Sequence, residues 1–120
     1  MKKRILICDD DEEILLICAH ILEKQGYEIH TSQHCNDILE IVKEISPDLI
    51  LMDNRIPDSG GIIASQTLKK HEEFRHIPIV YFSANSDIKE LATTAGADAF
   101  LPKPFELSQL EKVISSLLKK

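Results

Sequence analysis

Five side chains with reactive or charged groups each come directly after a short apolar run. They are Asp9 and Asp10 after Ile5–Cys8, Asp53 after Leu49–Met52, Ser83 after Ile77–Phe82, and Lys103 after Phe100–Pro102. The intervals between these positions are those of one or two β-α-β units, each roughly thirty residues long. A parallel sheet brings the carboxyl ends of its strands to one edge, where α/β proteins bind ligands. The three acids, the hydroxyl and the ammonium are therefore expected to form one site.

The chemistry expected of this site is metal-assisted phosphoryl transfer. Asp9, Asp10 and Asp53 would repel one another unless a cation neutralises them or some of them are protonated. Oxygen ligands without His or Cys favour Mg²⁺, which takes one or two carboxylates and keeps several waters. With Mg²⁺ and Lys103 to stabilise charge on the transferring oxygens, Asp53 would be the nucleophile. Taken alone, the Asp9–Asp11 triplet is equally consistent with N-cap and first-turn acids of a helix.

Strand and helix patterns alternate along the chain, and this alternation would position the five groups. The apolar runs predict strands at Arg4–Cys8, Tyr27–Thr31, Leu49–Met52, Ile77–Phe82 and Asp98–Leu101. Apolar residues at helical spacing predict helices over Ile14–Leu22, Cys35–Ile45, Ile62–Lys70, Ser86–Ala95 and Leu107–Leu118. Five such repeats predict a doubly wound α/β sheet, with right-handed crossovers that place helices on both faces.

Composition narrows the class of protein. A chain of 120 residues with 43% apolar and 28% charged residues is typical of one globular domain. A net charge of −6 argues against nucleic acid as a direct partner. No run approaches the roughly 18–20 apolar residues of a membrane-spanning helix. Three cysteines without CxxC spacing are expected to be reduced thiols, so we expect a cytoplasmic protein.

Over its whole length, the chain resembles the receiver domains of two-component response regulators. The resemblance rests on Ile5–Asp10, Asp48–Asp53 with Pro57 and Gly61, Ser83-Ala84, and Lys103-Pro104-Phe105. It implies a flavodoxin-like (βα)₅ fold with five parallel strands in the order 2-1-3-4-5. It also implies a single receiver domain over residues 1–120, with no output domain.

For the acidic residues, the resemblance implies phosphorylation that depends on Mg²⁺ as cofactor. Asp53 would accept a phosphoryl group from a histidine kinase or a phosphotransfer protein. Asp10, Asp53 and the backbone carbonyl of Arg55 would bind the metal directly, and Asp9 would assist through water. The chain would not be an enzyme, and at most would catalyse its own phosphorylation and dephosphorylation.

For the other residues, the resemblance implies a switch. Ser83 and Lys103 would contact the phosphoryl group, and Lys103-Pro104 would be a cis peptide bond. Ser83 would move toward the phosphoryl group and let Phe100 turn inward, unless Phe100 is a fixed, half-exposed strand residue. The face built from the fourth helix, fifth strand and fifth helix would then change its affinity for a downstream protein, or for a second copy in a phosphorylation-dependent homodimer. The sequence names neither the kinase nor the target, and leaves a phosphorelay intermediate and a diffusible effector equally open.

Two residues are expected to tune the lifetime of the phosphoryl group. The Arg55 side chain could cover it and obstruct the in-line water, or could instead point into solvent. Asn85 offers a short amide at the same mouth and no carboxylate to orient the water. Slow autodephosphorylation is therefore expected.

Two rival functions remain to be tested. A small phosphatase of the haloacid dehalogenase type would need a DxDx[TV] motif, and Asp9–Glu13 supplies no Thr or Val at its last position. A pseudo-receiver that binds partners without phosphorylation would be indicated by loss of Asp10, Asp53 or Lys103, and all three are present. Labelling with acetyl phosphate and Mg²⁺ would distinguish these alternatives.

Overall fold

Strands and helices alternate throughout the computed structural model, which describes residues 2–34, 37–53, 60–83, 88–103 and 106–118. The five strands are β1 (Arg4–Cys8), β2 (Glu28–Ser32), β3 (Leu49–Asp53), β4 (Ile79–Ser83) and β5 (Ala99–Pro102). The five helices are α1 (Glu12–Lys24), α2 (Ile38–Ile45), α3 (Gly60–Lys70), α4 (Ile88–Ala95) and α5 (Leu107–Leu118). All strand pairs are parallel, and the order β2-β1-β3-β4-β5 confirms the predicted topology.

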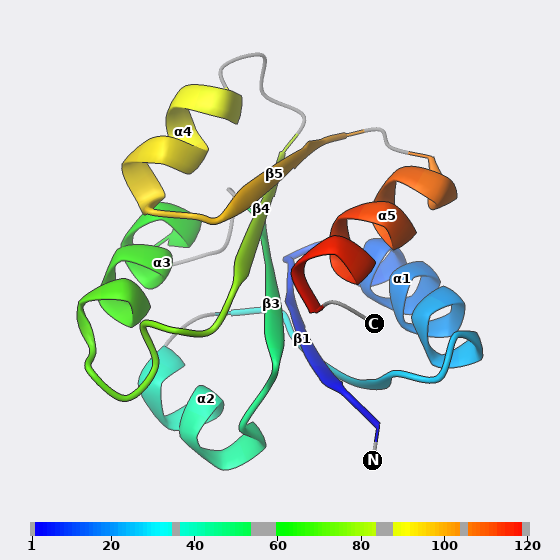
Figure 1. Ribbon diagram of the computed structural model, residues 1–120, viewed down its shortest axis with the longest axis horizontal. Helices are drawn as coiled ribbons and strands as arrows, with labels where there is room; N and C mark the ends of the chain where they lie inside the picture. The colour runs from blue at the N-terminus through cyan, green and yellow to red at the C-terminus, as the bar shows by residue number, and fades with distance from the viewer. Residues whose placement is uncertain (1, 35–36, 54–59, 84–87, 104–105, 119–120) are drawn as a thin grey trace.

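The sheet separates two hydrophobic cores, one on each face (Figure 1). Successive residues of a strand point to opposite faces, so Ile5 and Ile7 pack beneath α1 and α5, whereas Leu6 and Cys8 pack beneath α2, α3 and α4. Every residue of β3 and β4 is buried, because these strands are covered on both faces. The continuous apolar runs of the sequence have this origin.

Local features end the helices where the sequence changes character. Gly26 follows α1 with φ of 94° and Gly96 follows α4 with φ of 78°, a backbone conformation that glycine adopts without steric cost. Ser46 ends α2 with φ of 54°, and its N–H donates to the carbonyl of Val42. These positions match the predicted ends of the three helices.

Some predicted boundaries were wrong by one or two residues. The fourth strand begins at Ile79 rather than Ile77, because the Ile77 N–H donates to the Phe74 carbonyl in the preceding turn and Pro78 has no N–H to donate. The third helix begins at Gly60, two residues earlier than predicted, and Gly61 lies on its buried side. Within the described ranges, no helix is long and apolar enough to cross a membrane.

Candidate functional site

The carboxyl ends of four strands meet at one edge of the sheet. Strand pairing places Asp53 at the end of β3 beside Phe82, and Ser83 at the end of β4 beside Pro102. The Lys103 N–H extends the β4–β5 pairing by donating to the Ser83 carbonyl over 2.8 Å. On the other side, the Asp9 N–H donates to the Ser32 carbonyl over 3.1 Å. Backbone hydrogen bonds thus fix the positions from which the reactive side chains project.

Three carboxylates form a cluster at this edge. Asp9, Asp10 and Asp53 each offer an oxygen, and these oxygens lie within 4.8 Å of one another. Asp9 is fully buried and Asp53 is 3% exposed, whereas Asp10 faces solvent. Hard oxygen ligands from two or three carboxylates, with one side open for water, suit Mg²⁺. The residues present therefore fit the metal that the sequence predicted.

Lys103 joins the two buried carboxylates. Its Nζ donates to Asp9 Oδ2 over 2.8 Å and to Asp53 Oδ1 over 2.9 Å. The same ammonium lies 4.6 Å from the centre of the Phe82 ring, a distance at which the ring face attracts a cation. Phe82 was not predicted as a site residue, since an apolar residue before Ser83 reads as core from sequence alone.

Burial and charge act against each other in this group. Burial raises the pKa of Asp9, although hydrogen bonds from Lys103 and from the Asp11 N–H partly oppose the shift. Burial alone would lower the pKa of Lys103, but its hydrogen bonds to Asp9 and Asp53 outweigh this effect and raise the pKa. Lys103 therefore stays protonated at neutral pH and holds a positive charge between two carboxylates.

The sequence allowed two roles for the Asp9–Asp11 triplet, site residues or helix-capping acids, and the structure shows members of both kinds. Asp11 is the N-cap of α1, because its Oδ1 accepts the Glu13 N–H over 2.9 Å. Asp9 Oδ1 in turn accepts the Asp11 N–H over 2.9 Å. Asp9 thus connects the start of α1 to Lys103. Of the three residues of the triplet, Asp9 and Asp10 belong to the acidic cluster and Asp11 does not.

The structure describes both residues predicted to act as the switch. Ser83 is 4% exposed at the site, and Phe100 is 40% exposed on β5. Phe100 pairs with Tyr81 and so lies on the face of the sheet covered by α3 and α4. The predictions for Arg55, Asn85 and Pro104 fall outside the described residues.

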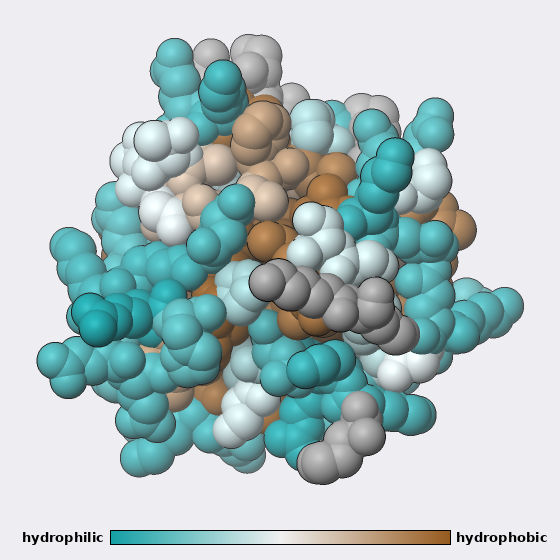
Figure 2. All heavy atoms as spheres, in the orientation of Figure 1, coloured by the Kyte–Doolittle hydropathy of each residue, from teal (hydrophilic) through white to brown (hydrophobic). Residues whose placement is uncertain are grey.

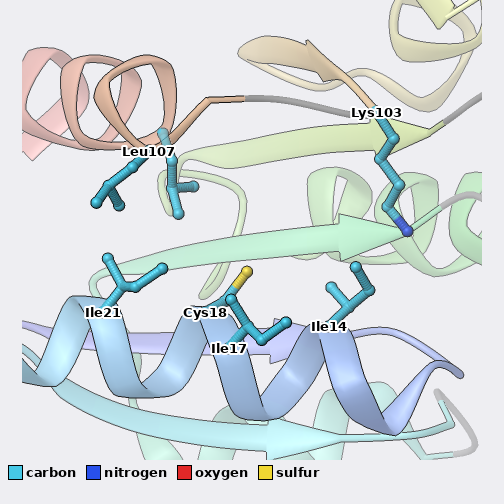
Figure 3. Close-up of a pocket in the computed structure, with 7 residues that line it drawn as sticks. Ile14, Ile17, Cys18, Ile21, Lys103 and Leu107 are labelled. Atoms are coloured by element: carbon cyan, nitrogen blue, oxygen red, sulfur yellow. The ribbon is translucent and has the colours of Figure 1, made fainter.

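An apolar groove beside the site was missed by the sequence analysis. It has a volume of about 300 Å³ and lies between α1 and α5, with the Lys103 side chain at one end (Figure 3). Its other lining residues are Ile14, Ile17, Cys18, Ile21, Leu107 and Leu110. Ile17 is 55% exposed and Leu107 is 45% exposed. In the sequence, Ile17 belongs to the apolar face of α1 and reads as a core residue. Its position beside a groove becomes visible only when α5, which is distant in sequence, is placed next to α1.

Comparisons with known sequences identify the family of this chain. Residues 5–115 match the family model of the response regulator receiver domain. The chain is 31% identical over 121 residues to the polar-differentiation response regulator DivK of Brucella ovis, covering 98% of both chains. It is 34% identical over 106 residues to the CAI-1 autoinducer sensor kinase/phosphatase CqsS of Vibrio cholerae. That match covers 86% of this chain but only 16% of CqsS.

Solved structures show the same fold. A putative response regulator from Chloroflexus aurantiacus superposes with a TM-score of 0.94 at 24% identity, over the full length of both chains. The receiver domain of the sensor histidine kinase PA1611 from Pseudomonas aeruginosa superposes with a TM-score of 0.90 at 24% identity, also over both full lengths. That structure has a magnesium ion coordinated in its active-site cleft. A parallel sheet of this topology, with acids and a lysine at its carboxyl edge, defines a signalling receiver, and the chain belongs to the response regulator receiver domain family.

Proposed function

We propose that this chain is a phospho-accepting receiver in which Asp53 is phosphorylated in an Mg²⁺-dependent reaction. The observation that carries the proposal is the convergence of Asp9, Asp10, Asp53 and Lys103 at one sheet edge. Bound to the carboxylates, Mg²⁺ would supply positive charge to the transferring phosphoryl oxygens, as the magnesium-bound receiver of PA1611 suggests.

The chain's own residues account for the remaining chemistry of transfer from a phosphohistidine. An Asp53 carboxylate oxygen attacks phosphorus, the P–N bond breaks, and the imidazole nitrogen keeps the electron pair. Lys103, already 2.9 Å from Asp53 Oδ1, is placed to donate to the phosphoryl oxygens. Ser83, at the end of the neighbouring strand, offers a hydroxyl on the same edge. The product is an acyl phosphate on Asp53.

Intact-mass spectrometry after incubation with acetyl phosphate and Mg²⁺ tests this proposal. The protein should gain one phosphoryl group, and Asp53→Asn should gain none. Asp11→Asn is a matched control, because it removes a neighbouring carboxylate while Asn remains an effective N-cap. Labelling of Asp53→Asn at the level of the unchanged protein would show that another residue is the acceptor.

We further propose that a histidine kinase or phosphotransfer protein, the phosphodonor, binds at the groove between α1 and α5. A phosphohistidine must reach Asp53 at this edge, so the donor has to bind next to it. Lys103 both lines the groove and contacts Asp53, and the half-exposed Ile17 and Leu107 offer apolar surface beside it. Apolar surface of this kind is typical of protein interaction sites.

A charge in the groove should separate donor binding from chemistry. Ile17→Glu should slow phosphorylation by a protein donor and leave labelling by acetyl phosphate unchanged, because the small donor needs no groove. Leu16→Glu is the matched control: Leu16 is 64% exposed on the same helix but does not line the groove. Equal transfer rates for the two variants would place the donor elsewhere.

We propose that phosphorylation is read out at the surface formed by α4, β5 and α5. Figure 2 shows apolar side chains along the middle of this surface with a hydrophilic rim, and Phe100 lies 40% exposed on β5. Displacement of Ser83 toward the phosphoryl group would let Phe100 turn inward, changing affinity for a downstream protein or a second copy. Such coupling is typically about 1–3 kcal/mol. Nuclear magnetic resonance of the protein with beryllofluoride should show shifts around Phe100 and α4, and unshifted signals there would refute the readout.

A further inference from the structure

The ammonium of Lys103 contacts two of the three carboxylates that could hold a metal ion. It contacts one oxygen of Asp9 and one oxygen of Asp53, at 2.8 Å and 2.9 Å. The second oxygen of Asp9 accepts the Asp11 N–H, so both oxygens of this fully buried carboxylate already have donors. Of the three acids, only the exposed Asp10 has no hydrogen bond or ion pair to another described side chain.

We propose that Lys103 is an internal competitor of Mg²⁺: its ammonium takes part of the carboxylate charge in the metal-free protein and thereby weakens metal binding. This inference rests on the proposed function, because it assumes that the acidic cluster is the metal site. Entry of the metal would loosen the contact between Lys103 and Asp9 and leave the ammonium for Asp53 and its phosphoryl group.

Charge accounts for the direction of the effect. The three carboxylates and the ammonium together leave two negative charges, which one Mg²⁺ neutralises. Without the ammonium the same carboxylates would present three negative charges, and the repulsion between the ammonium and the metal would be removed. Both differences favour tighter Mg²⁺ binding in a variant that lacks the charge, and both act over less than 5 Å in a largely buried site.

The groove limits where the displaced ammonium can go. The stem of Lys103 lies at the end of a hollow whose other lining residues are apolar, and its nitrogen lies at the tip of β3 (Figure 3). Retreat into this hollow would leave a charge without partners, which is unfavourable. The ammonium should therefore stay at the sheet edge when the metal enters, next to the residue that becomes phosphorylated.

Isothermal titration of Mg²⁺ into the metal-free protein tests the competition without any phosphodonor. Lys103→Met, which keeps the apolar stem but removes the charge, should bind Mg²⁺ about tenfold more tightly, a difference of about 1.4 kcal/mol. Lys103→Arg keeps the charge and should stay within about twofold of the unchanged protein. Lys103→Gln, a neutral polar replacement, should also bind more tightly and serves if Lys103→Met does not fold.

Phosphorylation rates should move in the opposite direction. Lys103→Met and Lys103→Gln should be labelled more slowly by acetyl phosphate at saturating Mg²⁺, because the phosphoryl oxygens lose a cationic donor. Unchanged or weaker Mg²⁺ binding in both neutral variants would overturn the competition while leaving the proposed function intact. Failure of the unchanged protein to bind Mg²⁺ at all would overturn both.

Discussion

Lys69 links residues at the end of the sheet that lies opposite the acidic site. Replacing it with Met should lower the free energy of unfolding and leave the acidic site unchanged. Its Nζ donates to the Asp98 Oδ2 over 2.7 Å, to the Ile77 carbonyl over 2.9 Å and to the Arg75 carbonyl over 3.1 Å. The same Asp98 oxygen accepts the Ile79 N–H over 2.8 Å. One ammonium at the end of α3 therefore connects the beginnings of β4 and β5.

The size of the effect follows from the exposure of these groups. Hydrogen bonds to a charged group contribute about 1.5–3 kcal/mol where they are shielded from water. Lys69 is 19% exposed but Asp98 is 41% exposed, so we count the ion pair itself at no more than about 1 kcal/mol. Together with two carbonyls left without their donor, the expected loss in the free energy of unfolding is about 2–3 kcal/mol. For 120 residues this corresponds to a fall in Tm of roughly 8–12 °C.

Thermal and urea unfolding of Lys69→Met should be compared with Lys70→Met. Lys70 is the next residue of the same helix, is exposed, and makes no side-chain hydrogen bond or ion pair with the described residues, so its replacement should cost no more than about 0.5 kcal/mol. Titration of Mg²⁺ should give the same affinity for both variants, because neither residue is near the acidic cluster. Equal unfolding free energies for the two variants would refute the network as a source of stability.

Three further outcomes are expected. Ser65→Ala should raise the free energy of unfolding by about 1 kcal/mol, because the buried Ser65 hydroxyl has no hydrogen-bond partner among the described residues. Urea unfolding would measure this change, with Ser116→Ala at an exposed position as the control. Burial and the charge of Asp53 raise the pKa of Tyr81 to about 12. The folded protein therefore holds the Tyr81 proton more tightly than the unfolded chain does. The free energy of unfolding should fall by about 2–3 kcal/mol as the pH rises from 10 to 12, and the fall should be smaller in Tyr81→Phe. Arg55→Ala should shorten the lifetime of phosphorylated Asp53 at unchanged Mg²⁺ affinity, as phosphate release would show; an unaltered or longer lifetime would exclude shielding by Arg55.

The order and number of elements could be predicted from sequence because burial imposes simple patterns here. β3 and β4 lie under helices on both faces, so their residues form continuous apolar runs between polar ends. Boundaries were less predictable, since they depend on individual hydrogen bonds. Ile77 is as apolar as Ile79, but its N–H donates to the Phe74 carbonyl and Pro78 has no N–H, so the strand begins at Ile79.

The site could be predicted in its membership but not in its contacts. A parallel sheet must gather the residues that follow its strands, so Asp9, Asp53 and Lys103 were expected to meet. That Lys103 bridges both acids depends on rotamers and burial, which no spacing in the sequence records. The groove could not be predicted from the sequence for a similar reason. Ile17 and Leu107 border one hollow only because α1 and α5 cover the same face of the sheet.

The same contacts explain why a site of this kind tolerates buried acids. Burial raises the pKa of Asp9 and so opposes its ionised form, yet Asp9 also accepts hydrogen bonds from Lys103 and from the start of α1. Any ligand that binds only the assembled cluster adds to the stability of the folded state by mass action. On the proposed function, Lys103 in the metal-free protein and Mg²⁺ in the metal-bound protein would stabilise the same carboxylates. The ammonium that neutralises part of the carboxylate charge in the metal-free site is the one that the metal would have to displace in part. The displaced ammonium would then lie beside Asp53, where the proposed phosphoryl group would be attached.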